Sequence, residues 1–407
     1  MTIQVRIPEA DELPGFFDQL SRIFSGNSAI PENLERNRAL TELGRTLVAH
    51  DGPQLVGTAG ASSFQMTVPG GVDVPTAGIT QVSVAATHRR RGVLRAIMRR
   101  QLDDVHARGE PLAALYASQA PIYGRFGYGV GAWHSHLVIP RGRSAFQQPA
   151  RDGRVRVVDG EAALAVIPDL HERLRRAQPG SVSRPRAYWE VRVADPPDFR
   201  RGRSEAWFLV HDGDAGPDGF ATYRVAPRWN AEDPGGTLYL MDLLGATPAA
   251  TAALWRFCLD VDLMTRLEAA ARSPEDPVRH LLADPRAARN RVYDGLWVRL
   301  VDVPAALAGR RYSADDALVL EVRDEFCPWN AGRWQLHAAT GGAQCRRSER
   351  EPDLSLDVAD LAAAYLGGNR FAALAAAGRV DARDPNTVQR AERLFASSPA
   401  PWCTTHF

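Results

Sequence analysis

The fold of this 407-residue chain is decided by residues 82–94, which read VSVAATHRRRGVL. The apolar residues up to Val84 are typical of a strand, and the three arginines and Gly92 that follow are typical of a turn into a helix. Apolar side chains then recur at helical spacing, namely Leu94, Ile97, Met98, Leu102 and Val105. The stretch predicts a strand, a turn, and an amphipathic helix that begins at the arginines and runs to about residue 107.

The start of this helix is a candidate anion site. The first backbone N–H groups of a helix have no partner inside it, and they carry about half a positive charge. Gly92 would let the backbone approach a pyrophosphate closely. An isolated run of arginines is more often a solvated basic face. The position of Arg89–Arg91 between a strand and an amphipathic helix favours the anion site instead.

The first two thirds of the chain read as one plan used twice. Strand and helix patterns alternate through residues 1–147 and again through residues 148–288. The sequence Val210-His211-Asp212-Gly213 repeats Ala49-His50-Asp51-Gly52, each at the end of a predicted strand. The second strand-to-helix junction reads Gly245-Ala246-Thr247-Pro248 and lacks the arginines. We therefore expect two similar α/β domains, only one of which has a phosphate-binding turn.

Residues 289–407 predict a third α/β domain of a different kind. Strands are expected at 296–301, 318–322, 334–338 and 344–346, and helices at 358–366, 370–377 and 386–396. The last seven residues carry Trp402 and Phe407. A chain end is usually frayed, but two large aromatic side chains indicate that this one packs against the protein.

Composition excludes several classes of function. Hydrophobic residues make up 45% of the chain and charged residues 24%, which is typical of globular domains. A net charge of +1 excludes a dedicated nucleic-acid binder. The four cysteines are scattered, which predicts free thiols and no metal site. The acidic N-terminal start and the lack of a long apolar run predict a cytoplasmic protein with no membrane partner.

The stretch 82–94 resembles the GNAT superfamily of N-acetyltransferases, in which the pattern Q/R-x-x-G-x-G/A binds the pyrophosphate of coenzyme A. Arg89, Gly92 and Leu94 fall on the three fixed positions, and Leu94 departs from the usual Gly or Ala. The resemblance implies that the strand before the turn diverges from its neighbour. The backbone N–H groups of Val82 and Val84 would then be available to the pantetheine and to the thioester carbonyl.

A second stretch narrows the resemblance to the enhanced intracellular survival (Eis) family. Residues 117–129 read ASQAPIYGRFGYG, and the segments DGLWVRL at 294–300 and VPAAL at 303–307 also match, as does an aromatic last residue. The family architecture implies a catalytic GNAT domain at 1–147, a degenerate second one at 148–288 and a sterol-carrier-protein-like domain at 289–407. It also implies a homohexamer and a C-terminal tail that reaches the active site.

The resemblance implies roles for particular residues. Tyr123 takes the general-acid position, with Tyr128 as a competitor in the same motif, and the terminal carboxylate of Phe407 is the base. The N–H of Val84 is the candidate donor to the oxyanion. Acetyl-CoA would be bound by the turn and its two neighbouring strands, that is by Val82, Ser83, Val84, Arg89, Arg90, Arg91, Gly92, Val93, Leu94, Ser118 and Gln119.

The expected function is acetyl-CoA-dependent N-acetylation of a primary amine by direct transfer in a ternary complex. The family acceptors are aminoglycosides or similar polyamines, acetylated at several positions. The family's amine pocket is usually acidic, whereas Gly26 lies near where an acidic residue is expected and His406 precedes the last residue, which disfavours a polycationic acceptor. Two alternatives remain open: acetylation of protein lysines or small amine metabolites, and a non-catalytic carrier of a lipid or other ligand.

Overall fold

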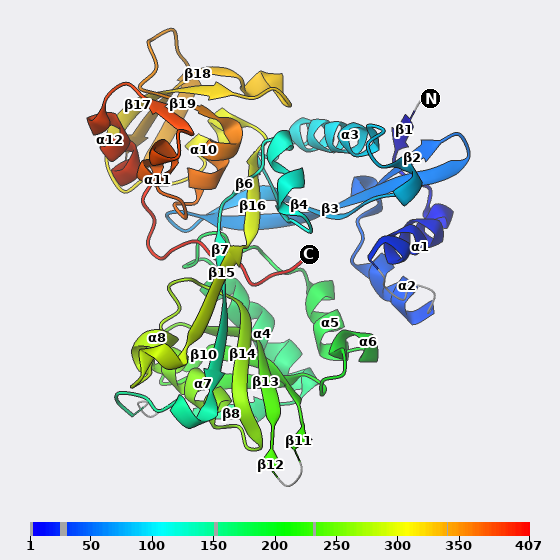
Figure 1. Cartoon of the computed structure of the whole chain (residues 1–407), viewed down its shortest axis with the longest axis vertical. Coiled ribbons are helices and arrows are strands. Elements are labelled where there is room, and N and C mark those ends of the chain that lie inside the picture. The colour runs from blue at the N-terminus through cyan, green and yellow to red at the C-terminus, as the bar shows by residue number, and fades with distance from the viewer. Residues whose placement is uncertain (1–2, 25–30, 150–153, 231–232, 340) are drawn as a thin grey trace. The chain divides into compact units, whose positions relative to one another are not determined.

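The structure is a computed structural model that describes residues 3–24, 31–149, 154–230, 233–339 and 341–407. The chain divides into two compact units (Figure 1). The first unit takes in residues 1–132, 296–401 and 406–407, and the second takes in residues 133–295 and 402–405. Among the described residues, no helix combines the length and the apolar character that crossing a bilayer requires.

The first unit is built on a mixed sheet with the strand order β1-β2-β3-β4-β5-β16-β6. The pairing of β4 with β5 is parallel, and the other pairings are antiparallel. The strands are β1 (Ile3–Arg6), β2 (Leu47–Asp51), β3 (Gln54–Val68), β4 (Val72–Val84), β5 (Leu112–Tyr116), β6 (Gly129–Val130) and β16 (Leu296–Leu300).

Helices cover both faces of this sheet. Val93 and Ile97 of α3 (Val93–Ala107) pack against a cluster that includes Leu47 and Ala49 of β2. Phe16 of α1 (Leu13–Phe24) packs against Val48, which lies between them on the same strand. Because side chains alternate along a strand, α1 and α3 lie on opposite faces. The short helix α2 (Pro31–Ala39) follows α1.

The parallel strands β4 and β5 separate after a short register. Their pairing runs from Thr76↔Leu112 to Gly78↔Ala114, and β4 continues six residues further, to Val84. A bulge in β4 follows, where Gln81 has a φ of 55°. The Thr58 hydroxyl donates to the Gln81 carbonyl over 2.8 Å and holds the bulge. Between 79 and 84, the described part of the chain gives β4 no partner strand on its β5 side.

The second unit repeats this plan, as the sequence predicts. Its sheet has the order β15-β7-β14-β13-β10-β9-β8, with β13 parallel to β14. The pairing of β10 with β13 has a bulge between Leu240 and Asp242, which matches the bulge of β4. The strands are β7 (Trp133–Pro140), β8 (Arg154–Val158), β9 (Trp207–Gly213), β10 (Gly216–Ala226), β13 (Gly236–Gly245), β14 (Met264–Arg272) and β15 (Arg289–Asp294).

In sequence, α7 lies between the two parallel strands of the second unit, as α3 lies between those of the first unit. A small hairpin, β11 (Trp229–Asn230) and β12 (Asp233–Pro234), accompanies the main sheet. The helices are α4 (Gly160–Arg175), α5 (Arg186–Ala194), α6 (Pro197–Arg200), α7 (Pro248–Asp260) and α8 (Val278–Leu281).

Two strands pair outside the predicted segment in which they lie. β7 falls within residues 1–147 but pairs with β14 and β15 of the second sheet. β16 falls within residues 289–407 but pairs with β5 and β6 of the first sheet. Hydrophobic patterning indicates that a segment is a strand, but not which sheet it joins, because pairing over such separations leaves no local signal.

A third sheet, in the first unit, has the order β19-β18-β17-β20-β21. The buried Arg310 donates to the carbonyls of Tyr365 and Phe395, at the ends of two helices of this region. The elements are β17 (Asp316–Arg323), β18 (Gly332–Ala339), β19 (Gly342–Arg347), β20 (Leu354–Asp357), β21 (Val380–Ala382), α9 (Val303–Ala308), α10 (Val358–Tyr365), α11 (Phe371–Ala376) and α12 (Pro385–Phe395).

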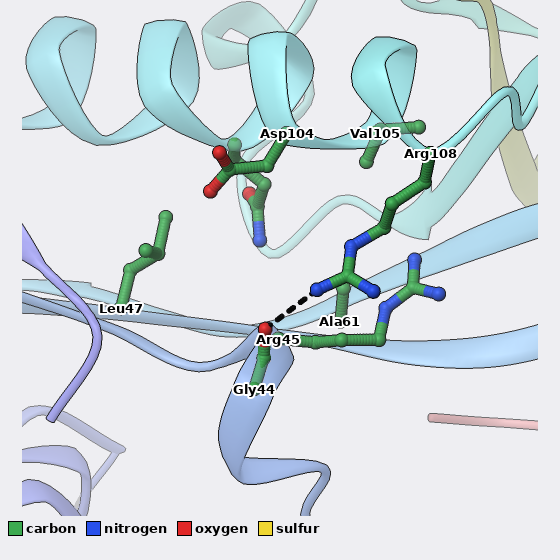
Figure 2. A pocket seen from close by; sticks show the side chains of 8 residues that line it. Gly44, Arg45, Leu47, Ala61, Asp104, Val105 and Arg108 are labelled. Atoms are coloured by element: carbon green, nitrogen blue, oxygen red, sulfur yellow. Dashed lines mark hydrogen bonds between the residues drawn. The ribbon is translucent and has the colours of Figure 1, made fainter. Parts of the chain in front are cut away.

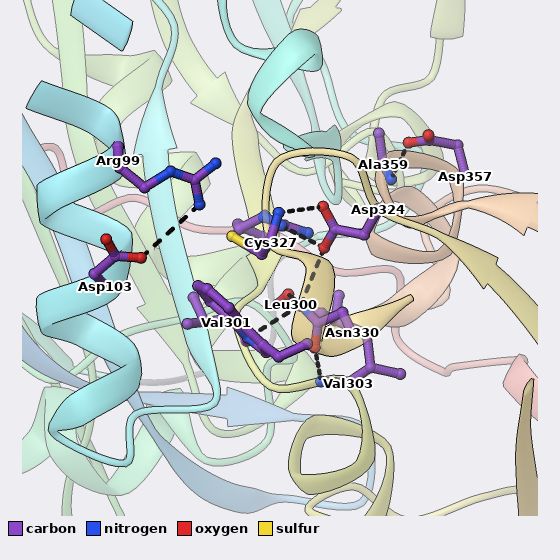
Figure 3. A network of polar contacts seen from close by, with 12 residues as sticks. Arg99, Asp103, Leu300, Val301, Val303, Asp324, Cys327, Asn330, Asp357 and Ala359 are labelled. Atoms are coloured by element: carbon purple, nitrogen blue, oxygen red, sulfur yellow. Dashed lines mark hydrogen bonds and ion pairs between the residues drawn. The ribbon is translucent and has the colours of Figure 1, made fainter. Parts of the chain in front are cut away.

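A buried ion pair, whose carboxylate partner Asp324 is labelled in Figure 3, joins this region to the first sheet. Arg299 of β16 donates to Asp324 over 2.5 Å, and their side chains are 0% and 1% exposed. Asp324 also accepts from the backbone N–H of Cys327 at 2.8 Å and from Asn330 at 3.0 Å. The carboxylate thus fixes the loop after β17 onto the edge of the first sheet.

Candidate active site

The arginine turn lies between η3 (Ala86–His88) and α3. The helix begins at Val93, not at the arginines as predicted, because Arg90 and Gly92 have φ values of 62° and 84° in the left-handed region. Arg89, Arg90, Arg91 and Gly92 are exposed. A turn of this kind, followed by a helix N-terminus, presents successive backbone N–H groups to an anion. The geometry of this turn is therefore suited to binding a phosphate group.

Asp51, at the end of β2, supports the turn. Its Oδ2 lies 3.4 Å from Nε2 of His88 and 3.9 Å from Nη2 of Arg91. The other ring nitrogen of His88, Nδ1, is 2.9 Å from the hydroxyl of Thr87. His88 is only 6% exposed, so its ring is held in place between these two partners. The HDG turn that contains Asp51 is visible in the sequence, but no local signal indicates that this residue supports the arginine turn.

Val93 and Leu94 contribute to the core rather than to the exposed turn. Val93 is 1% exposed and Leu94 is partly buried against a neighbouring cluster. Gly57 of β3 allows this packing, because a methyl group there would come within 2.8 Å of Ile97 and 3.0 Å of Val93. At Val93 and Leu94, the backbone N–H groups rather than the side chains are therefore suited to binding a ligand at the turn.

Val82, Ser83 and Val84 form the part of β4 that has left β5. Ser83 is buried, and its hydroxyl lies 2.7 Å from that of Thr58. Val82 and Val84 are half-buried. Alternate residues of an extended strand direct their backbone N–H and C=O groups to the same edge. The backbone groups of Val82 and Val84 therefore lie along one edge of β4.

Tyr123 lies after β5, between η4 (Ala120–Ile122) and η5 (Gly124–Phe126). It is 5% exposed and hydrogen-bonds to Ser118, which is itself exposed like Gln119. Burial raises the pKa of the Tyr123 hydroxyl above its ordinary value of 10, and the hydrogen bond with Ser118 opposes that rise. The phenol therefore stays protonated at neutral pH and is a proton donor.

Tyr128 is placed differently. Its ring packs edge-on against that of Tyr123, with centroids 6.0 Å apart. Tyr128 is 1% exposed, and in the described part of the chain its hydroxyl has no hydrogen-bond partner. Burial raises its pKa far more than that of Tyr123. Tyr123, which bonds to an exposed serine, is the more accessible of the two phenols.

The last two residues lie in the first unit, beside the point where β4 and β5 separate. The ring of Phe407 is 4.8 Å from that of Phe64 and 5.4 Å from that of Tyr116. A methyl group on Gly78, the last β4 residue paired with β5, would come within 3.1 Å of Phe407 Cδ2. The ring of His406 lies 4.4 Å from that of Tyr116. Gly26 lies outside the described residues.

A small pocket lies elsewhere in the first unit (Figure 2). Its lining includes Gly44 and Arg45 from the segment before β2, Gln101 and Arg108 from the region of α3, and the strand residue Ala61. Its cavity volume of about 20 Å³ accommodates little more than one water molecule. The pocket is therefore too small for a coenzyme or an amine substrate, and it shares no residue with the predicted site.

The residues present fit coenzyme A. The turn offers three exposed guanidinium groups and left-handed backbone for a diphosphate. The part of β4 that has separated from β5 offers backbone groups to an amide-containing arm. Tyr123, Ser118 and Phe407 stand near the divergence of the strands, on segments that follow or contact β5.

Comparison with known families defines the class of protein. A family model described as an acetyltransferase (GNAT) domain matches residues 4–131, and another of the same description matches residues 180–300. A sterol carrier protein domain model matches residues 303–404. The protein is thus an N-acetyltransferase with two GNAT domains and a sterol-carrier-protein domain, and the predicted fold class is confirmed.

Whole-chain relatives define the family. An N-acetyltransferase of Streptomyces avermitilis is 45% identical, with 99% of each chain covered. The N-acetyltransferase Eis of Mycobacterium tuberculosis is 35% identical, with 98% of each chain covered. The crystal structure of Eis1 from Mycobacterium abscessus has a TM-score of 0.87 at 35% identity, over 99% of this chain and 100% of that one. The chain belongs to the Eis family of GNAT N-acetyltransferases, which use acetyl-CoA.

Proposed function

We propose that this protein transfers the acetyl group of acetyl-CoA directly to a primary amine, within a ternary complex in the first unit. One observation carries the proposal: the ring of Phe407 lies against Gly78, which belongs to the last pair of β4 and β5, where the strands open. This contact brings the C-terminus of the chain next to the strand edge that would hold the thioester. The terminal carboxylate belongs to Phe407, whose ring lies beside Tyr116 of β5, and the buried phenol belongs to Tyr123, on the segment that follows β5.

The cofactor side of the site follows from the turn and the strand. Arg89, Arg90 and Arg91 would pair with the diphosphate, together with the backbone N–H groups of residues 92–94. Residues 82–84 would bind the pantetheine arm, with Ser118 and Gln119 on the facing segment. Bound acetyl-CoA supplies the activated acetyl group. The N–H of Val84 would stabilise the negative charge that develops on the carbonyl oxygen.

Proton transfer falls to the two remaining groups. Tyr123 would donate its proton to the departing sulfur, since burial keeps its hydroxyl protonated. The carboxylate of Phe407 would take the proton of the attacking amine, directly or through one water molecule. The rings of Phe64 and Tyr116 lie against that of Phe407 and would hold this end of the chain in place.

The acceptor is proposed to be a primary amine of an aminoglycoside or a similar polyamine, acetylated at several positions. Protein lysines or small amine metabolites are the alternative acceptors. The rings of Phe64, Tyr116, His406 and Phe407 gather at the C-terminus, and aromatic faces attract ammonium groups. Family likeness further supports a cytoplasmic homohexamer.

The test moves the carboxylate without changing the ring. One glycine added after Phe407 shifts the charge by one residue, and we expect kcat to fall about 100-fold, the lower range for loss of a general base. Phe407→Leu is the matched control, because it keeps the carboxylate in place, and it should retain most of the activity. Full activity after the glycine addition would rule out the terminal carboxylate as the base.

A further inference from the structure

The second sheet has an opening of the same kind as the first. The parallel pairing of β13 with β14 ends at Leu240↔Ala269, and both strands continue beyond it. The junction after β13 lacks arginines; instead, the Thr247 hydroxyl accepts from the N–H of Ala250 and caps α7. This opening in the second sheet therefore has no counterpart of the arginine turn. Cofactor binding does not explain the role of the opening.

Trp402 lies at this opening, against β14. Its indole Nε1 donates to the carbonyl of Ala271 on β14 over 2.5 Å, and its backbone N–H donates to the carbonyl of Pro179 over 2.8 Å. The guanidinium of Arg272 stacks 4.5 Å from the indole centroid and donates to the Leu243 carbonyl on β13 over 3.0 Å. Trp402 is 4% exposed. Arg272 and Trp402 together bridge the two diverging strands.

Arg184 holds the next residues of the tail. Its Nε and Nη2 donate to the hydroxyls of Thr405 and Thr404, each over 2.8 Å. Its Nη1 pairs at 2.5 Å with Asp242, which lies on β13 beyond the last parallel pair. The side chain of Arg184 is fully buried, and that of Asp242 is 4% exposed. Charge-assisted hydrogen bonds of this kind are strong and directional.

The residue between them is held as well. Nε2 of His134 lies 2.8 Å from the Cys403 carbonyl and donates to it. Cys403 is fully buried. Residues 402–405 therefore have at least one polar contact each with the second unit, from β14, β7 or the segment around 179–184. Phe407 follows Thr405 by two residues, so its Cα lies within about 7 Å of the Cα of Thr405.

We propose that the opening of the second sheet is the binding site for residues 402–405, and that Trp402 and Arg184 act as positioning residues for the terminal carboxylate. The degenerate domain thus retains the strand divergence of a GNAT domain and uses it to bind a peptide segment of its own chain. The catalytic consequence rests on the proposed function, whereas the anchoring of the tail does not.

The experiment measures anchoring and catalysis separately on the full-length chain. Carboxypeptidase A is added to the native protein, and the release of Phe407 is followed with time. The variants are Trp402→Ala and the double variant Thr404→Val/Thr405→Val, which removes two acceptors of Arg184 with little change of volume. Trp229→Ala is the matched control, because Trp229 is a 60% exposed tryptophan of the same unit.

We expect Phe407 to be released about ten times faster from both tail variants than from the control, since an unanchored end opens locally. We also expect kcat to fall about tenfold, with the KM for acetyl-CoA unchanged, since the carboxylate loses its position. Trp402→Phe should recover part of both. Release at the control rate would overturn the proposed tail site.

The two proposals fail in different ways. Faster release with an unchanged kcat would support the tail site but overturn the positioning role, together with the assignment of the carboxylate as base. Wild-type protein that is inactive with every amine would overturn the proposed function, and the release rates would still decide whether the second sheet binds the tail.

Discussion

Oδ2 of Asp51 lies 3.4 Å from Nε2 of His88, so the turn between β2 and β3 braces the arginine turn before α3. The same carboxylate reaches Arg91 at 3.9 Å. We expect Asp51→Asn to raise the KM for acetyl-CoA about tenfold, the effect of losing about 1.4 kcal/mol of charge-assisted contacts. Steady-state kinetics with acetyl-CoA as the varied substrate would measure it.

Asp212 provides the matched control for this prediction. It takes the place of Asp51 in the repeated sequence, where it pairs with Arg156 at 2.7 Å in the second unit. Asp212→Asn should leave the KM for acetyl-CoA unchanged. Equal effects of the two substitutions would mean that the arginine turn is not the diphosphate site.

Loss of the hydroxyl should have different effects at the two buried tyrosines. Tyr123→Phe should lower kcat about 100-fold, because the departing sulfur loses its proton donor. Tyr128→Phe should keep its activity and its stability, because it removes a buried hydroxyl without a partner among the described residues. Measurement of kcat and of the thermal unfolding midpoint for both variants checks this, and the reverse order would assign the acid to Tyr128.

The buried pair of Arg299 and Asp324 should contribute to stability through its geometry. Asp324→Asn leaves the fully buried Arg299 without its counter-charge, and we expect the free energy of unfolding to fall by about 3–5 kcal/mol. Urea denaturation followed by fluorescence measures the loss. Asp104→Asn is the control, because the pair of Arg100 and Asp104 is exposed and should contribute little. A small loss for Asp324→Asn would contradict the structural role of this pair.

His171 should make the second unit less stable in mild acid. Burial lowers the pKa of its ring well below the ordinary value of 6.5, and Arg184 and Arg175 act in the same direction. Below pH 6.5 the unfolded chain therefore takes up a proton that the folded chain does not. The free energy of unfolding should fall by up to about 1.4 kcal/mol per pH unit as the pH drops from that value.

The matched variants isolate this contribution. His171→Leu should flatten the dependence of the urea midpoint on pH between 5 and 6.5, roughly the window set by the ordinary histidine value. His280→Asn, at an exposed position of α8, should keep the wild-type dependence. The same slope in both variants would show that His171 is not responsible.

The features that could be predicted from the sequence are those encoded locally. The apolar stripe of residues 94–105 fixed the orientation of α3, and the HDG turns indicated the repeated fold. The arginine turn could be located because its strand, turn and helix are contiguous. The start of the helix was misplaced by four residues, since the left-handed conformation of Arg90 has no sequence signal as clear as a glycine.

The features that could not be predicted depend on residues far apart in the sequence. Asp51 supports His88 across 37 positions, and Arg184 holds Thr405 across 221. The exchange of β7 and β16 between sheets is of the same kind. Trp402 and Phe407 did indicate that the tail packs, because two large aromatic residues at a chain end are costly to expose. What they pack against required the fold.

The central claim is that the first unit transfers an acetyl group from acetyl-CoA to an amine. The most direct test mixes protein, acetyl-CoA and a panel of primary amines, and follows release of the coenzyme A thiol. We predict release that depends on the amine and is lost in Gly92→Val, which cannot easily adopt the φ of 84° at this turn. Absence of amine-dependent release with every amine, or equal release from Gly92→Val, would contradict the account.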